Sequence, residues 1–440
     1  MYEKGTQKVL DALLNDKFTD GIIGPSVKML GPVKNGGLIL YVTTPGCWGP
    51  MITPTIRGGH EVNVPVAVDD ASVGDAVAIS IESIRVRSKA TSSGTDRPVN
   101  GAYVGDPYVA KKCPNCGEPW PKSALEGIGL EAIKCEKCGS PSSPFRMVNG
   151  YTIVFDERRC LGVAVREEVA RRLAADGYAW MDIPRNSRQF PVIIAAKADL
   201  VGLSMRLRPF LGQLGTTPSV DIPDSHNAGD FGTFLIGAPH KYAITEQQYK
   251  ECITDGHLDI DSVREGAVLV APVKLDGAGI YAGDAHAQQG DGEVAGHTTD
   301  ISAEVKVRVN VIKGLNLKGP LLFPPLEDLP PLAKPMCVEE WALVKRLANE
   351  YGLEPEPWLP VQVIGTGPNI NKAAETGFSR ASELFDMSVD EVRNRVTVAG
   401  AVEIGRLPGV VQVTLPVPVK KMKELRLYEI TKKLYAPPFE

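Results

Sequence analysis

Short apolar runs rich in valine and isoleucine recur along the chain, and glycine or proline separates most of them. This pattern predicts a predominantly β structure, because β-branched residues favour strands whereas glycine and proline interrupt them. We expect strands at residues 37–42, 75–86, 192–196, 267–273 and 305–312. The last of these alternates strictly between apolar and polar residues, which predicts an antiparallel strand with one buried and one wetted face.

Helical periodicity is limited to fewer segments. Val165, Val169 and Leu173 recur at four-residue spacing, and Gly177 follows where the end of a helix is expected. Residues 338–351 and 373–385 are the other helix candidates. The proline-rich residues 320–335 are expected to form neither a helix nor a central strand, because proline lacks the amide hydrogen that both require.

These patterns suggest four parts of the chain. We expect an N-terminal part of a β core at residues 1–104, an inserted segment at residues 105–150, the central β core at residues 151–319 and an α/β part at residues 320–440. The expected fold is therefore mainly β with α/β additions.

Two cysteine pairs lie in the inserted segment, Cys113 with Cys116 and Cys135 with Cys138. Each pair has the Cys-x-x-Cys spacing of a zinc ribbon, and a glycine follows each pair. Four thiolates fill the tetrahedral positions around zinc, so this ion is expected to be structural rather than catalytic. Redox-active or free cysteines are the alternative.

The composition is that of an ordinary globular protein, with 43% hydrophobic and 23% charged residues. The net charge of -5 is spread along the sequence, which argues against a nucleic-acid-binding surface. The charged start does not resemble a secretory signal, and no apolar run approaches the roughly 18 residues of a membrane span. We expect a cytoplasmic protein that binds neither nucleic acid nor a membrane.

Residues 283–297 contain the densest group of chemically useful side chains. Glycines bring the backbone close to a neighbour there, while aspartate, histidine and glutamate are ligands of hydrolytic divalent metals. Asp284 and His286 lie two positions apart, so an extended segment would direct both to one face. These residues alone leave open a metal or catalytic site and a merely structural polar turn.

The segment Gly-Asp-Ala-His-Ala-Gln-Gln-Gly-Asp-Gly-Glu-Val-Ala-Gly at residues 283–296 resembles the acetamidase/formamidase family, whose members hydrolyse small amides to carboxylate and ammonia. Further segments resemble other family patterns: residues 208–218, His60 with residues 64–75, and residues 376–385. The resemblance covers most of the chain except roughly residues 105–150.

The sequence departs from the family pattern in two places. The family's Gly-Gly-Asn-x-Asp segment has two competing counterparts, residues 225–230 and residues 255–260, so the matching carboxylate is Asp230 or Asp259. Asp300 occupies a position where the family tends to have glutamate, and His297 is an added histidine near it.

The resemblance implies a CUB-like β sandwich, here with an inserted zinc ribbon, and a divalent metal at the active site that is expected to be zinc. The implied catalytic residues are Glu293, Asp284, His286 and Asp300. The implied substrate contacts are His60, His297 and Gly292. The candidate ligands of the catalytic metal are Asp284, His286, Asp230, Asp259, His226 and His257.

We therefore expect metal-dependent hydrolysis of a small carboxamide of the formamide or acetamide type. The alternatives are hydrolysis of a lactam or another C–N bond, and a non-catalytic ligand-binding or scaffold role. Because family members are usually oligomeric, the resemblance also implies a homo-oligomer.

Overall fold

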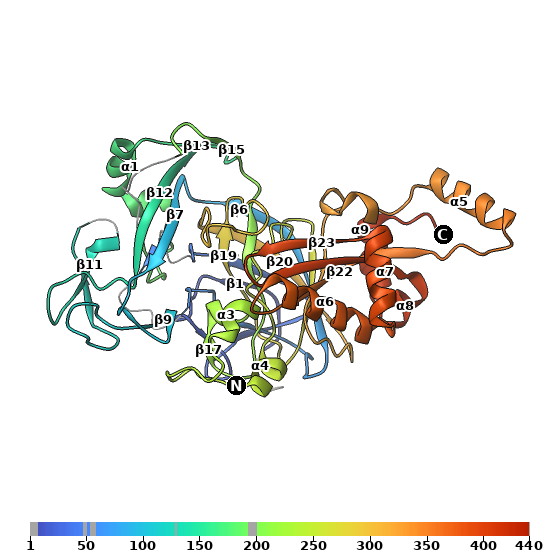
Figure 1. Ribbon diagram of the computed structural model, residues 1–440, viewed down its shortest axis with the longest axis horizontal. Coiled ribbons are helices and arrows are strands. Elements are labelled where there is room, and N and C mark those ends of the chain that lie inside the picture. The colour runs from blue at the N-terminus through green and yellow to red at the C-terminus, as the bar shows by residue number, and fades with distance from the viewer. Residues whose placement is uncertain (1–7, 47–50, 53–58, 128–129, 192–199, 440) are drawn as a thin grey trace.

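The computed structural model describes residues 8–46, 51–52, 59–127, 130–191 and 200–439 (Figure 1). A large mixed sheet of twelve strands dominates this part of the chain. Its order is β16 (Phe210–Thr216), β19 (Ile280–His286), β5 (Val66–Val68), β3 (Leu30–Val42), β20 (Ala303–Ile312), β6 (Ala76–Val86), β18 (Val268–Pro272), β21 (Leu321–Phe323), β22 (Trp358–Thr366), β24 (Val410–Pro418) and β23 (Ala401–Arg406), with β1 (Leu10–Asn15) paired to β3. The mainly β prediction is confirmed.

Strand β20 shows how the alternating pattern is used. Its first residues are buried and half-buried in turn, and it pairs antiparallel with β3 and β6. The other expected strands of the sheet are confirmed within β3, β6 and β18. The strand expected at residues 192–196 lies outside the described residues.

The sheet curves around a buried apolar core. Thr216, at the end of β16, donates a side-chain hydrogen bond to the carbonyl of Pro272 at the end of β18, at 2.6 Å. These two strands are far apart in the strand order, so the sheet must fold back to bring them together. Ile39, Ile79 and Val307 are completely or almost completely buried in the enclosed core. A CUB-like sandwich remains a prediction.

The C-terminal helices cover the other end of the sheet. The helices α6 (Ile370–Phe385), α7 (Val389–Ala399) and α8 (Val419–Glu424) pack against β24, and α9 (Tyr428–Tyr435) packs against β21 (Figure 1). Helix α5 (Val338–Glu350) projects from this end. The helices expected near residues 338–351 and 373–385 are confirmed, whereas α7, α8 and α9 were not expected.

The proline-rich segment corrects one prediction. Residues 321–323 form β21, a central strand between β18 and β22, and short 3-10 turns follow at η3 (Leu326–Asp328) and η4 (Pro331–Ala333). The strand is possible because its three residues, Leu-Leu-Phe, include no proline and keep their amide hydrogens.

A second, four-stranded sheet has the order β15 (Ser204–Arg206), β13 (Leu161–Ala164), β12 (Phe145–Phe155) and β7 (Ala90–Pro98). Beside it lie α1 (Glu167–Ala174) and α2 (Gly177–Met181), so Gly177 begins a second helix instead of ending the first. The cysteine-rich segment contains β9 (Asp106–Lys111), β10 (Ser123–Leu125), η1 (Leu130–Ala132) and β11 (Ile133–Cys135). Figure 1 places it at the opposite end of the molecule from α5.

The remaining short elements connect these parts. They are β2 (Ile22–Ile23), β4 (Met51–Ile52), β8 (Tyr103–Val104), β14 (Phe190–Pro191), β17 (Ile222–Pro223), η2 (Asp224–His226), α3 (Gly229–Thr233) and α4 (Glu246–Cys252). Among the described residues, no helix combines the length and the apolar character needed to cross a bilayer.

Candidate active site

The end of β19 places two of the predicted site residues next to each other. Asp284 and His286 are buried, and Nε2 of His286 lies 3.3 Å from Oδ1 of Asp284. The backbone of Asp284 has a φ of 51°, in the left-handed region that residues other than glycine rarely adopt. Such a conformation often marks a functional site, because the surrounding fold must hold it in place.

Two further histidines approach Asp284 from other segments. Nε2 of His257 lies 3.5 Å from Oδ2 of Asp284, and Nε2 of His60 lies 3.8 Å from the same oxygen. Asp259 joins them, because its Oδ2 lies 3.0 Å from Nε2 of His257. All four side chains are at most 5% exposed, so the cluster is shielded from bulk water.

Neighbouring groups hold these histidines in place. Nδ1 of His257 donates a hydrogen bond to the backbone carbonyl of Ser225 at 2.6 Å. The side-chain amide nitrogen of Gln213 lies 3.1 Å from Nδ1 of His60. A histidine whose Nδ1 donates to a carbonyl keeps the lone pair of Nε2 free, as a metal ligand requires.

Arg406 supplies a buried positive charge beside the cluster. Its guanidinium forms two hydrogen bonds to Asp230, at 2.6 and 3.1 Å, and another to Oδ2 of Asp259. The guanidinium also lies over the ring of Phe231, 4.7 Å from its centroid. Arg406 therefore links Asp230 to Asp259, which belongs to the cluster directly, so both competing candidates for one carboxylate lie at the site.

The titratable groups of the cluster have strongly shifted pKa values. Burial raises the pKa of Glu293 well above its usual range, and the Asp259 carboxylate adds to this shift. Burial also raises the pKa of Asp300 to about 6 and lowers the pKa of His60 to about 3. Although burial opposes it, electrostatic interactions with the His60 and His286 rings hold the pKa of Asp284 well below its usual range. The site thus combines a protonated carboxyl group with an ionised one.

The donor atoms of the cluster fit a divalent metal. Two overlapping groups, His60 with His257 and Asp284, and Asp259 with Asp284 and His286, each place their ligand atoms within 4.8 Å of one another. Oδ1 of Asp259 is buried and accepts no hydrogen bond from the described residues. Lone pairs that face one another in a buried site repel unless a cation lies between them. Imidazole and carboxylate ligands together suit zinc.

The structure places the other predicted residues around this cluster. Asp300 is fully buried, with Oδ1 3.3 Å from Nε2 of His286. Gly292 accepts a backbone hydrogen bond from Leu407 at 2.8 Å, next to Glu293 and Arg406. His297 is 5% exposed in the segment between β19 and β20.

His226 does not belong to either group of possible metal ligands. Its Nε2 donates to Oδ2 of Asp106 at 2.6 Å, and its Nδ1 lies 2.9 Å from the hydroxyl of Ser225. The fold therefore selects His257 over His226 as the histidine of the cluster. Because the two occupy similar positions in the competing segments, only their three-dimensional contacts distinguish them.

The four cysteines form a separate candidate metal centre. Sγ of Cys113 lies 3.6 Å from Sγ of Cys138, Sγ of Cys116 lies 3.9 Å from Sγ of Cys135, and all four sulfurs lie within 4.8 Å of one another. A tetrahedral zinc ion at 2.3 Å from each sulfur requires sulfur separations of about 3.8 Å. The four side chains therefore fit a zinc ion.

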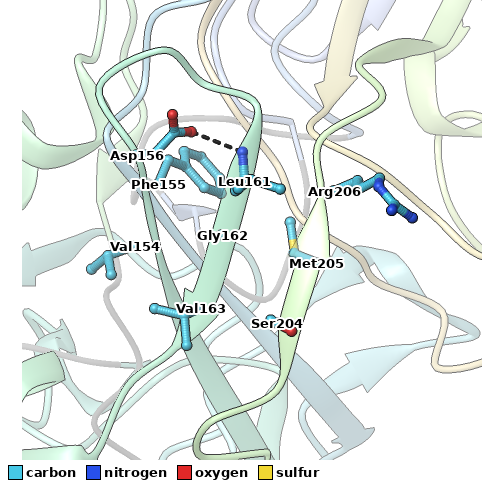
Figure 2. Close-up of a pocket in the computed structure, with 9 residues that line it drawn as sticks. All are labelled: Val154, Phe155, Asp156, Leu161, Gly162, Val163, Ser204, Met205 and Arg206. Atoms are coloured by element: carbon cyan, nitrogen blue, oxygen red, sulfur yellow. Dashed lines mark hydrogen bonds between the residues drawn. The ribbon is translucent and has the colours of Figure 1, made fainter.

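A pocket of about 650 Å³ lies elsewhere, against β12, β13 and β15 (Figure 2). Its lining is largely apolar and includes Phe155, Leu161 and Met205, with Asp156 and Arg206 at its rim. None of the predicted site residues lines it. Its lining residues include no histidine, and Asp156 supplies their one carboxylate.

Sequence reasoning missed Arg406, Phe231 and Gln213. Gln213 lies inside residues 208–218, one of the segments that resemble the family, but its neighbours gave no reason to select it. Arg406 left a weak signal, because a charged residue just before Leu-Pro-Gly at the end of a strand needs a partner if it is buried.

The fold and this buried cluster define a mainly β protein with a site of the hydrolytic type. Residues 47–422 match the Acetamidase/Formamidase family, and the chain belongs to this family. It is therefore an amidohydrolase that acts on linear amides. No curated protein matches the sequence.

Several solved structures are similar to the chain. A predicted acetamidase/formamidase from Thermoanaerobacter tengcongensis is 16% identical with a TM-score of 0.52, covering 96% of this chain and 99% of its own. An acetamidase from Yersinia enterocolitica is 16% identical with a TM-score of 0.50, covering 94% and 93%. An acetamidase from Bacillus halodurans is 15% identical with a TM-score of 0.50, covering 94% and 99%. At these identities the likeness shows a shared fold.

Proposed function

We propose that the protein hydrolyses a small carboxamide of the formamide or acetamide type to carboxylate and ammonia in a metal-dependent reaction. The observation that carries the proposal is the convergence of three histidines and two aspartates at Asp284. Their nitrogen atoms and carboxylate oxygens lie within 4.8 Å of one another in two overlapping buried groups, an arrangement that a divalent cation would stabilise.

His60, His257, His286, Asp259 and Asp284 are the residues that would hold the metal. When bound, a divalent ion such as zinc polarises an amide carbonyl and lowers the pKa of a bound water. The low pKa of His60 keeps its ring neutral, and the low pKa of Asp284 keeps its carboxylate charged. Asp284 is therefore ionised, as ligation requires, and the ring of His60 carries no charge.

Glu293 is suited to proton transfer. Its raised pKa leaves it protonated near neutral pH, so it can give a proton to the departing nitrogen, which leaves as ammonia. Once ionised, the same carboxylate can accept the proton of the carboxylic acid product, which leaves as carboxylate and restores the protonated form of Glu293. Although burial opposes it, the charges of His257 and Arg406 hold the pKa of Asp259 below its usual range, so this carboxylate does not compete for these protons.

The cysteine centre serves a different purpose in this proposal. A zinc ion bound by Cys113, Cys116, Cys135 and Cys138 has no open coordination position, so it stabilises the inserted segment without taking part in the reaction. The close agreement between the observed sulfur separations and those of a tetrahedral zinc site supports this assignment.

Ammonia release from a panel of amides tests the proposed reaction. The panel contains formamide, acetamide, a longer aliphatic amide and a lactam, each incubated with the purified protein before and after treatment with a chelator. We expect turnover of the two smallest amides, loss of activity after chelation and recovery on addition of zinc. Turnover of the lactam alone, or full activity after removal of all metal, would contradict the proposal.

A further inference from the structure

The start of the cysteine-rich insertion contacts residues that lie beside the candidate metal ligands. Asp106, the first residue of β9, is 1% exposed, and its carboxylate accepts the hydrogen bond from His226 described above. His226 is fully buried. A carboxylate and an imidazole that are both removed from water must keep this contact, because losing it leaves a buried polar group without a partner.

The turn η2, which contains His226, holds two of the candidate metal ligands. The carbonyl of Ser225 accepts a hydrogen bond from Nδ1 of His257 at 2.6 Å, and Oδ1 of Asp224 accepts one from the backbone amide of His60 at 2.5 Å. The Ser225 hydroxyl lies 2.9 Å from Nδ1 of His226, so the ring of His226 helps to hold the turn in place. Asp106 therefore anchors the turn on which His60 and His257 depend.

A second contact from β9 reaches the same histidine. The ring of Tyr108 packs against Phe231 with 4.7 Å between centroids. Phe231 stacks on His257, with 5.6 Å between centroids and an angle of 19° between the rings, and it also lies beneath Arg406. Two residues of one short strand thus support His257 through separate neighbours, one polar and one aromatic.

We propose that Asp106 and Tyr108 are positioning residues of the amidase site, so that the cysteine-rich insertion is a working part of the enzyme. This inference rests on the proposed metal-dependent function. Groups that orient a ligating histidine raise the affinity of a site for its metal, and their loss typically lowers affinity or activity by about 10- to 100-fold. The zinc of the insertion then supports the reaction indirectly, by keeping β9 folded.

The test measures zinc affinity at the histidine and carboxylate site of the full-length protein by competition with a chelator. Asp106→Asn removes the charged acceptor of the hydrogen bond from His226, and Tyr108→Leu keeps an apolar side chain but loses the aromatic contact. The matched control is Glu118→Gln, which breaks an exposed ion pair with Lys137 within the same insertion. Turnover of acetamide and the midpoint of thermal unfolding are recorded for each protein.

We expect both variants to bind zinc about 10- to 100-fold more weakly at this site and to lose kcat in proportion, while the cysteine site keeps its zinc and the control matches the wild type. A lower unfolding midpoint with zinc affinity and kcat within twofold of the wild type would overturn the inference and leave a purely structural role. If Asp106→Asn does not fold, the zinc affinity and kcat of Tyr108→Leu decide between these two outcomes. A wild-type protein without zinc beyond the cysteine site and without ammonia release would instead overturn the proposed function.

Discussion

The two candidate metal centres of this protein are built in opposite ways. The cysteine centre takes its four ligands from one short segment, and Cys116 within it is exposed to solvent. The histidine and carboxylate cluster consists of buried side chains from segments that are far apart in the chain, from His60 to Arg406. Four thiolates close the first centre, whereas the second contains acceptor atoms that other protein groups do not satisfy. A closed set of ligands supports structure, and an open set leaves room for a substrate.

The largest effect is expected when the buried cation of the cluster is removed. Arg406→Met leaves the carboxylates of Asp230 and Asp259 buried without their partner, which should lower the free energy of unfolding by about 3–5 kcal/mol. Chemical denaturation measures this change. Arg85→Met is the control, because Arg85 is 79% exposed and its pair with Glu304 is worth at most about 1 kcal/mol. Equal losses in the free energy of unfolding of the two variants would show that burial does not increase the contribution of an ion pair.

The next effect concerns catalysis alone. Asp284→Asn removes the charge shared by both groups of candidate ligands and should reduce ammonia release from acetamide by about 100-fold or more. Elemental analysis should still find the zinc of the cysteine centre. Asp390→Asn, at a carboxylate that is 89% exposed, should change neither quantity. Near-native turnover of Asp284→Asn would place the active site elsewhere.

Removal of the cysteine centre should have a smaller effect on turnover. Replacing Cys113 and Cys116 with serine should remove one zinc per chain and lower activity by about tenfold, because β9 loses support while the ligands at Asp284 remain. Cys160→Ser is the control, since Cys160 is an exposed cysteine outside the cluster. Unchanged zinc content in the double variant would reject the zinc assignment.

The smallest effect should come from the two positions that depart from the family pattern. Asp300 faces His286, and His297 is buried in the segment just before Asp300. Substitution of either residue should therefore change the effect on kcat/KM of substituting the other. We expect His297→Thr and Asp300→Glu to show a coupling of more than about 0.5 kcal/mol when kcat/KM is measured in a double-mutant cycle. Additive changes would mean that the two residues act independently.

The same contrast explains what could be predicted from the sequence. Cysteine spacing revealed the local centre, and the alternation in β20 revealed a strand of the main sheet, because both patterns lie within a few consecutive residues. The choice between His226 and His257, and the part played by Arg406, depend on contacts between segments far apart in the chain. No local periodicity encodes such contacts. The strand β21 was not predicted because the prolines on either side of it argued against any strand there. Its three residues, 321–323, are nevertheless able to pair.

The position of Arg406 also affects the order in which the enzyme can mature during its synthesis. The guanidinium that neutralises Asp230 and Asp259 lies in β23, which pairs with the following strand, β24, at one end of the strand order of the large sheet. A ribosome must therefore translate the chain as far as Arg406 before these carboxylates meet their cation, and contacts between such distant segments form slowly. We infer that nascent chains that end before β23 leave Asp230 and Asp259 without this cation, so activity should emerge only after β23 has been made.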